Sequence, residues 1–374
     1  MTTTDTVQDW LALLEARYPL ATQASWDNSG LQVGDPNWPV ARVLVTLDVT
    51  PQVLDEAAAV NHTLVVAHHP LVFQPLRSVT PATASGRLAL DAATRQIAIT
   101  AAHTNLDVAT DGTNTSMPVA RVLNLTNLTS LDRTVATEPD VKLVTFLPKE
   151  AVEMVRDALA DAGAGIIGAY NRCSFLQPGV GTFRPGEQAN PEVDVPLLET
   201  AAVEEQRLEM VVPRRQLHAC VAALKAHHPY EEVAYDVYER VGPAAGFGMI
   251  GDLPEPATVG ELATHIAATL PAPDLRVAGP RDRVVSRVAV CGGAGESLIG
   301  AALAQGADLY VTGDLKHHGV LDALTLGMSL IDAGHHATEH AALPSVCDAL
   351  RDDAAHKGLS AAVVASEVNT SPWS

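Results

Sequence analysis

Cysteine is scarce in this chain, and its spacing suits neither a metal site nor a disulfide. The 374 residues include four cysteines that lie far apart and form no CxxC pair: Cys173, Cys220, Cys291 and Cys347. This spacing argues against a thiolate zinc site and against a disulfide framework. We therefore expect a protein of the reducing cytoplasm.

Long apolar runs and basic residues are also lacking. No run approaches the roughly 20 residues that a membrane helix needs, and the first residues lack the basic and apolar regions of a signal peptide. The chain has 24 basic against 44 acidic residues, a formal net charge of −20. Because such a surface repels phosphate, we expect no membrane or nucleic-acid partner without a local basic patch. Arg281, Arg283 and Arg287 are the best candidate, but composition favours a solvated strand edge there.

Apolar sequence is abundant, at 47% of the residues, and the length predicts two or more domains. Strands and helices alternate over the first part of the chain. The predicted strands are 41–50, 63–67 and 97–102, and the predicted helices are 51–60 and 87–96. This order predicts a parallel sheet with covering helices, whose working residues lie beyond the carboxyl ends of the strands. His68, His69, His103 and Asp107 all fall there.

The last part of the chain repeats this alternation, and the middle differs. The predicted late strands are 287–291, 308–312 and 328–333, with a loop at 292–296, a helix to about 304, another over 319–326, and a last one carrying Ala341, Leu343, Val346 and Leu350. The middle holds two β-α-β copies at an offset of 65 residues, which pairs Pro148 with Pro213 and Tyr170 with Tyr235. Its predicted strands are 142–148, 169–175, 207–213 and 231–239, and its predicted helices are 149–162 and 214–226.

Two tandem β-α-β units are typical of a ferredoxin-like sandwich. The fold class is therefore α/β, a split domain of parallel-sheet β-α-β halves with an inserted α+β ferredoxin-like domain. We expect the split domain over 1–135 and 242–374 and the insertion over 136–241. The hinges are expected near 130–140 and 242–248.

Histidines and carboxylates gather at the predicted strand ends. His335 and Glu339 are four residues apart, so both can aim at one point above the sheet if a helix begins by residue 337. Asp107 and Glu339 could each bridge two cations, and with three imidazoles, His68 and His69 among them, they supply enough ligands for two metals. Such two-metal sites hold their ions about 3.5–4 Å apart and use an activated water.

Simpler interpretations exist for each of these residues. Glu339 alone could be an acidic group at a helix N-terminus, and His68 and His69 could be surface residues of a turn. Pairing across strand ends favours the metal site. His103 could be a further ligand, an orienting residue or a catalytic proton relay.

The remaining motifs are weaker. His317 and His318 have equal claims to substrate contact and to a structural role, and His227 and His228 look structural or interfacial. His336 and His340 are expected to face away from the cluster. The GGAGE loop at 292–296 could cradle an anion, although a tight strand-to-helix turn is the better interpretation. The sequence has neither a GxSxG elbow nor a Ser–His–Asp order.

The chain resembles the Ngg-interacting-factor-three-like proteins, also described as dinuclear metal centre hexameric proteins and as type 2 homologues of GTP cyclohydrolase I. The segments that carry the resemblance are WDNSGLQVG (26–34), AHHPLVF (67–73), HTNLDVA (103–109) with Gly112 and Asn114, CGGAGE (291–296), TGDLKHH (312–318) and GHHATE (334–339). AYNRCSF and HPYEEVAYDVY in the insertion resemble the copper-tolerance/PII-type domain of longer members.

The resemblance implies a toroidal homohexamer, a trimer of dimers, with two divalent ions per subunit, drawn from Zn, Fe, Mn, Co or Ni. Its implied ligands are His68, His69, Asp107, His335 and Glu339. It also implies a metal-dependent hydrolase, in which metal-activated water opens the guanine ring of GTP or attacks a related small molecule. The alternatives are a non-catalytic regulatory or metal-handling assembly and a plain structural protein.

Overall fold

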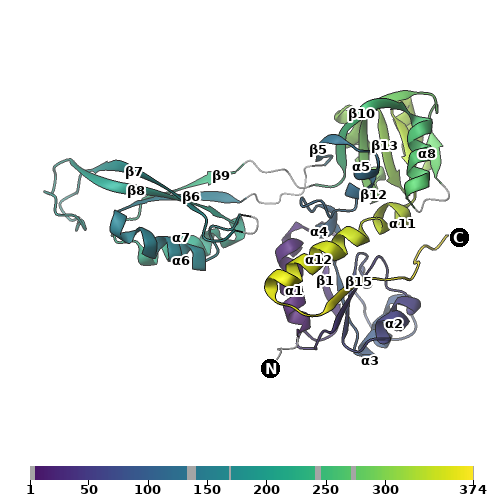
Figure 1. The fold of residues 1–374 in the computed structure, drawn as a ribbon, viewed down its shortest axis with the longest axis horizontal. Helices are drawn as coiled ribbons and strands as arrows, with labels where there is room; N and C mark the ends of the chain where they lie inside the picture. The colour runs from purple at the N-terminus through teal and green to yellow at the C-terminus, as the bar shows by residue number, and fades with distance from the viewer. Residues whose placement is uncertain (1–4, 133–139, 168–169, 241–245, 271–274, 374) are drawn as a thin grey trace. The chain divides into compact units, whose positions relative to one another are not determined.

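The computed structural model describes residues 5–132, 140–167, 170–240, 246–270 and 275–373. The chain divides into two compact units, which we call the host unit (Met1–Thr137 and Pro243–Ser374) and the inserted unit (Glu138–Gly242). Figure 1 shows their elements. The expected boundaries after 135 and 241, and most of the two expected hinges, lie outside the described residues.

The first sheet of the host unit has five strands in the order β1-β4-β3-β2-β15. They are β1 (Gly30–Val33), β2 (Arg42–Thr46), β3 (Thr63–Ala67), β4 (Ala98–Ala101) and β15 (Ala362–Ala365). Strands β15, β2, β3 and β4 run parallel, and β1 pairs antiparallel with β4. All five residues of β3 are buried, which is why its apolar run is continuous.

The second sheet of the host unit is mixed, with the order β11-β14-β13-β12-β10-β5. Its strands are β5 (Thr126–Ser130), β10 (Met249–Thr258), β11 (Arg276–Ala278), β12 (Val284–Ala294), β13 (Leu309–Gly313) and β14 (Ser329–Asp332). The predicted strands β12, β13 and β14 are parallel, and the other three pair antiparallel at the edges.

Helices cover both sheets of the host unit. They are α1 (Val7–Arg17), α2 (Pro51–Ala58), α3 (Ala84–Thr94), α4 (Thr104–Asp107), α5 (Met117–Val122), α8 (Val259–Thr269), α9 (Ile299–Ala304), α10 (His317–Thr325), α11 (His335–His340) and α12 (Leu343–Lys357). The single helix predicted after residue 333 is wrong, because two helices stand there. Pro344 has no N–H to donate to the preceding turn, so α11 cannot continue into α12.

The two sheets of the host unit share chain segments. Strand β5 comes from the first part of the chain but pairs with β10 of the second sheet. Helix α12 and β15 come from the last part and return to the first sheet, where Val346 and Leu350 pack with Val43 and Val45. Because each part of the chain contributes a strand to the other sheet, the parallel strands of both sheets end within the same host unit.

The inserted unit has the element order of a ferredoxin-like fold. It comprises β6 (Val141–Leu147), α6 (Val152–Asp161), β7 (Ser174–Phe183), β8 (Ala201–Val212), α7 (Leu217–His227) and β9 (Tyr235–Glu239). The antiparallel sheet has the order β7-β8-β6-β9, and Leu143, Leu159, Met210 and Leu224 are buried beneath the two helices.

Three strands of the inserted unit differ clearly in their bounds from the prediction, and the one expected at 231–239 begins only at Tyr235. The strand expected at 169–175 begins at Ser174 and runs to Phe183, and its partner β8 is also longer than expected. The sequence of β7 contains residues that are typical of loops, namely Pro178, Gly179 and Gly181. Most of the strand is also exposed, so its sequence lacks the apolar alternation that predicts a strand.

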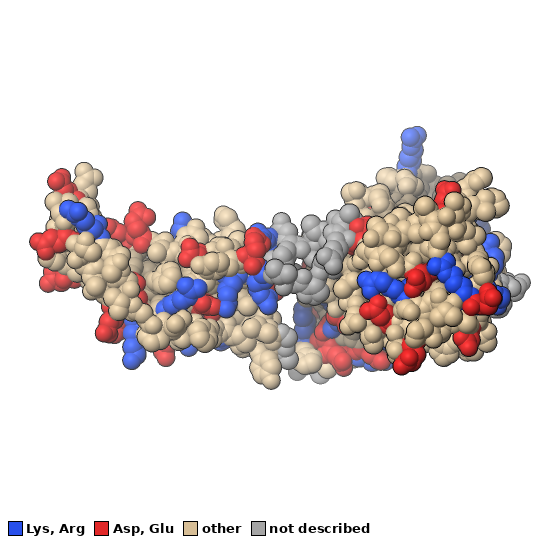
Figure 2. Space-filling view, turned by 90° about the horizontal axis from the view of Figure 1, so that it is seen from above, with Lys and Arg blue, Asp and Glu red and all other residues tan. Residues whose placement is uncertain are grey.

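Charged side chains of both signs are interspersed on the face that Figure 2 shows, and most of that face is formed by other residues. Among the described residues, no helix has both the length and the apolar character needed to cross a membrane.

Candidate metal centre

The predicted site residues meet within the host unit. His68 and His69 directly follow β3, and His103 follows β4 and precedes α4, which ends at Asp107. His335 opens α11, directly after the turn that follows β14, and carries Glu339 one turn later. The carboxyl ends of parallel strands from both sheets therefore supply the side chains, as expected.

Glu339 lies at the centre of this cluster and is only 4% exposed. One of its oxygens, Oε2, lies 3.0 Å from Nε2 of His69 and 3.1 Å from Nε2 of His335. The other, Oε1, lies 3.6 Å from Nε2 of His68, and that same nitrogen lies 3.7 Å from Oδ1 of Asp107. Both carboxylates thus approach one buried imidazole nitrogen.

His68 and His69 are each oriented by a contact at Nδ1, the ring nitrogen that points away from the cluster. Nδ1 of His68 lies 3.0 Å from the carbonyl oxygen of Ala102, and Nδ1 of His69 lies 2.8 Å from Oδ1 of Asp48. A carbonyl oxygen can only accept, so Nδ1 of His68 carries the proton and Nε2 presents a lone pair to the cluster.

The other two histidines have the same arrangement. Nδ1 of His335 lies 2.7 Å from Oδ2 of Asp314, and Nδ1 of His103 lies 2.8 Å from Oδ1 of Asp27. Asp27 also accepts hydrogen bonds from the backbone N–H and the hydroxyl of Thr104. Carboxylates that hold the rear nitrogen of an imidazole are the usual supports of metal-binding histidines, because they fix the ring and its tautomer.

The cluster fits a cation and is poorly satisfied without one. Nε2 of His68 and Oε2 of Glu339 are buried, and neither has a hydrogen-bond partner of acceptable geometry in the structure. Nε2 of His69 and Nε2 of His335 both lie within 3.1 Å of that oxygen, and they lie 3.3 Å from one another. Lone pairs that face one another in a buried site repel unless a proton or a metal lies between them.

Two groups of side chains could each hold an ion. The ligand atoms of His68, His69 and His103 lie within 4.8 Å of one another, and so do those of His69, His335 and Glu339. His69 belongs to both groups. Asp107 belongs to neither, although it lies beside His68, so its predicted bridging role stays a prediction.

The electrostatics of the cluster favour a negative centre with positive surroundings. Burial raises the pKa of Glu339, but the imidazoles of His68 and His335 outweigh burial and bring that pKa well below its ordinary value. Burial lowers the pKa of His69, whereas the carboxylates of Asp48 and Glu339 beside its ring raise the pKa to about 10. Burial is also outweighed at His335, where Glu339 helps to raise the pKa to about 9. The carboxylate therefore stays ionised.

The GGAGE segment makes room for the cluster. Gly292 and Gly293 belong to β12, so the predicted loop over 292–296 is wrong at its start. A Cβ on Gly293 would overlap Oε1 of Glu339, and a Cβ on Gly292 would lie 2.7 Å from Thr115. Gly293 also has a φ of +65°, which L side chains rarely adopt.

A cavity of about 700 Å³ in the host unit opens onto the cluster. Its lining includes Trp26, His103, Asp107, Cys291 and Glu339. Trp26 is 60% exposed, and its ring lies 6.0 Å from that of Phe73 and 6.2 Å from that of His103. Burial raises the pKa of Cys291 to about 12, which keeps its thiol protonated.

The other histidine pairs lie apart from the two groups. His317 and His318 open α10 with their rings 5.2 Å apart and do not line this cavity. His336 and His340 stack on one another, with ring centroids 5.1 Å apart. Nε2 of His228 bonds to the carbonyl oxygen of Phe146 in the inserted unit, which suits a structural role.

Sequence reasoning missed the residues that support the ligands. Asp27, Asp48 and Asp314 each hold one histidine, and Thr115 donates a 2.6 Å hydrogen bond to Asp107. Asp48 had a usable signal, since it follows β2 at the same distance as His69 follows β3, two residues after the strand ends. Asp27 follows no predicted strand, and its signal was its place in the WDNSGLQVG segment that carries the family resemblance.

The fold and this site first define a class. The chain is a mixed α/β protein with a ferredoxin-like insertion and histidine-carboxylate clusters that could hold metal ions. The family model of Duf34/NIF3 (NGG1p interacting factor 3) matches residues 5–372, so the chain belongs to this family. The resemblance drawn from the sequence motifs is thereby confirmed.

Individual relatives match over the full length. A Bacillus subtilis protein with the name GTP cyclohydrolase 1 type 2 homolog is 39% identical over 98% of this chain and 97% of its own. A Mycobacterium tuberculosis protein of the same name is 36% identical over 98% of this chain and 96% of its own. The crystal structure of a Bacillus cereus protein related to NIF3 matches with a TM-score of 0.83 and 38% identity, and covers 100% of both chains.

Proposed function

We propose that this protein is a metal-dependent hydrolase that holds two divalent ions and acts on a small molecule with a metal-activated water. The observation that carries the proposal is the convergence of buried, poorly satisfied Nε2 and carboxylate atoms at the end of an open cavity. Nitrogen and oxygen ligands of this kind suit Zn, Fe, Mn, Co or Ni.

The residues of the chain have separate tasks in this proposal. A bound pair of divalent ions supplies Lewis acidity and an activated water. His68, His69, His335, Asp107 and Glu339 hold the ions. The contact that each imidazole makes through Nδ1 fixes the orientation of its ring, so Nε2 stays directed into the site. The site is therefore formed before any substrate arrives.

His103 is the proposed proton relay. Its ring lies 5.1 Å from that of His68 and lines the cavity, while Asp27 fixes its Nδ1. A histidine so placed can take a proton from an attacking water or give one to a leaving group. The same ring could serve as a ligand of the first group, and the two roles predict different metal contents for a His103→Ala variant.

The proposed substrate is a nucleotide or a related small molecule with a hydrolysable ring. The curated relatives carry the name of a GTP cyclohydrolase homologue, which motivates this class. A cavity of about 700 Å³ has the size of ordinary small-ligand sites, and the exposed face of Trp26 offers a planar ring a surface on which to stack.

The test is turnover by metal-loaded protein across a panel of nucleotides and phosphoesters. Asp107→Ala and Glu339→Gln should lose metal and at least about a hundredfold of the activity, since each removes a charged ligand. The matched controls are Asp161→Ala and Glu153→Gln on the surface of α6. Full activity in Asp107→Ala, or an inert wild type across the panel, would contradict the proposal.

A regulatory or metal-handling role is the second candidate. The observation in its favour is the inserted unit, which is compact, has its own core and contains its own cavity. In this case the protein would bind metal and a second ligand without turnover. None of the substrates in the panel would be converted, although the protein would still hold stoichiometric metal.

A further inference from the structure

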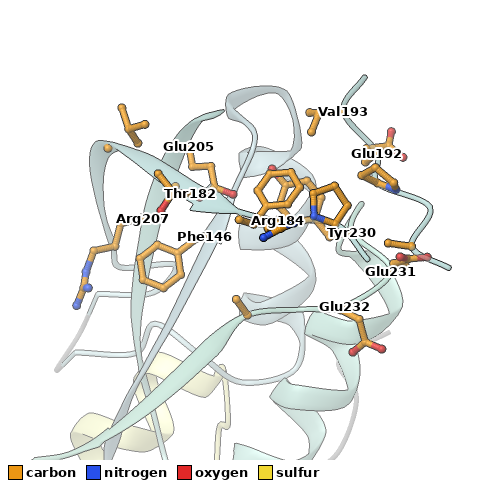
Figure 3. Close-up of a pocket in the computed structure, with 18 of the residues that line it drawn as sticks. Phe146, Thr182, Arg184, Glu192, Val193, Glu205, Arg207, Tyr230, Glu231 and Glu232 are labelled. Atoms are coloured by element: carbon orange, nitrogen blue, oxygen red, sulfur yellow. The ribbon is translucent and has the colours of Figure 1, made fainter. Parts of the chain in front are cut away.

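The inserted unit contains a cavity that the metal centre does not use. Its volume is about 730 Å³, and its walls come from the outer part of the β7–β8 hairpin, from residues 184–193 and from residues 230–234 (Figure 3). All of these belong to one compact unit. This size matches that of ordinary small-ligand pockets.

Three aromatic side chains line this cavity: Phe146, Phe183 and Tyr230. The guanidinium of Arg207 lies 5.6 Å from the centre of the Phe146 ring, so one face of this ring already contacts a cation. Aromatic faces attract cations because their π-systems are electron-rich. The apolar walls would also bury the body of a ligand.

Carboxylates outnumber cations in the lining. The acidic members are Glu192, Glu205, Glu231 and Glu232, and the basic members are Arg184 and Arg207. Arg207 donates a 2.7 Å hydrogen bond to Glu209, so its charge is already compensated. The cavity is therefore negative overall, and an anionic ligand would be repelled.

The position of Glu205 is fixed by the hairpin. It pairs with Gly179 on β7, and its side chain lies against Gly181, where a Cβ would overlap its Oε2. Partial burial and the nearby carboxylate of Glu205 raise the pKa of Tyr230 to about 12, so the phenol stays a hydrogen-bond donor. Tyr230 and Glu205 thus both line this cavity, and the Tyr230 hydroxyl itself is buried.

These carboxylates do not form a metal site. Among the described residues, the groups that could hold a metal ion involve only the histidines and Glu339 of the host unit. Spread around a wide cavity with aromatic walls, the carboxylates suit a cation that carries a large apolar body.

We propose that the cavity of the inserted unit binds an organic cation, an amine attached to an aromatic or similarly bulky apolar group. The aromatic walls take up the apolar body, and Glu205 pairs with the ammonium group. The site is independent of the metal centre, so it is available whether or not the host unit catalyses hydrolysis.

The test uses the full-length, metal-loaded protein and three probes of similar shape: phenethylamine, 2-phenylethanol and 3-phenylpropionate. Binding is measured by calorimetry and by ligand-observed NMR. We expect phenethylamine to bind at least about tenfold more tightly than the neutral alcohol, and the acid not to bind. Equal affinity for all three probes, or no saturation by phenethylamine up to about 10 mM, would overturn the proposal.

Variants locate the site. Glu205→Gln should weaken phenethylamine binding about tenfold or more, whereas Glu153→Gln on the surface of α6 should leave it unchanged. If Glu205→Gln disrupts the hairpin, Glu192→Gln provides the second test, with a smaller loss expected. Chelation of the metal should leave phenethylamine affinity unaltered. Loss of binding on chelation would place the amine in the host unit and contradict the assignment.

Discussion

At the scale of single residues, the candidate metal centre depends on a glycine without a side chain as well as on the ligand side chains. Glu339 and His335 occupy their positions because no side chain projects from Gly293. The ligands could be predicted from the sequence, because histidine pairs after buried strands are unusual. The need for glycine beside Glu339 could not, because the two residues are 46 positions apart and meet only through the packing of α11 on β12.

A residue-scale prediction follows from this packing. Gly293→Ala should lower the free energy of unfolding by about 2 kcal/mol or more, because the new methyl group meets Glu339 and the backbone has a left-handed φ of +65°. It should also reduce bound metal, measured by elemental analysis. Gly300→Ala in α9 is the matched control, since a methyl group there would have no atom within 4 Å and alanine favours the helix. Unchanged metal content in Gly293→Ala would contradict the contact.

At the scale of elements, strands buried on both faces were predictable and most edge strands were not, although the edge strand β9 was predicted at 231–239. Strand β3 has the predicted bounds because five consecutive residues are buried. Strands β5 and β11 and the hairpin β7–β8 are exposed on much of their surface, so apolar patterning does not mark them. The break between α11 and α12 was also missed, because apolar spacing continues across Pro344.

Removal of metal should act on particular elements. Helices α4 and α11 carry Asp107, His335 and Glu339, so an ion held by these residues, as proposed, would cross-link the two helices. Chelation should accelerate amide exchange in both helices about a hundredfold, since a ligand at 100 times its dissociation constant contributes about 2.7 kcal/mol. Helices α6 and α7 of the inserted unit serve as internal controls. Equal acceleration in all four helices would indicate global loosening and would contradict a local metal site.

At the scale of the whole molecule, the inserted unit interrupts the host unit and has a core of its own. Among the residues that the structure describes, all the metal-binding candidates lie in the host unit. Replacing residues 140–241 by a short Gly-Ser linker should therefore preserve metal content, measured by elemental analysis, while phenethylamine binding disappears. Loss of metal in a variant that still folds, as judged by cooperative thermal unfolding, would contradict the separation of the two units.

The surface of the β7–β8 hairpin is relevant to the hexamer that the family resemblance implies. Phe175 is 58% exposed, and Leu176 and Val180 are exposed on the same strand, so apolar side chains accumulate where an isolated chain would face water. Six chains of 39.3 kDa would give a species of about 236 kDa by light scattering. We expect Phe175→Ser to shift this species toward smaller assemblies because it removes apolar area that assembly would bury. Leu326→Ser, on an exposed residue just after α10, is the control and should leave the mass unchanged. A monomeric wild type at micromolar concentration would rule out the hexamer.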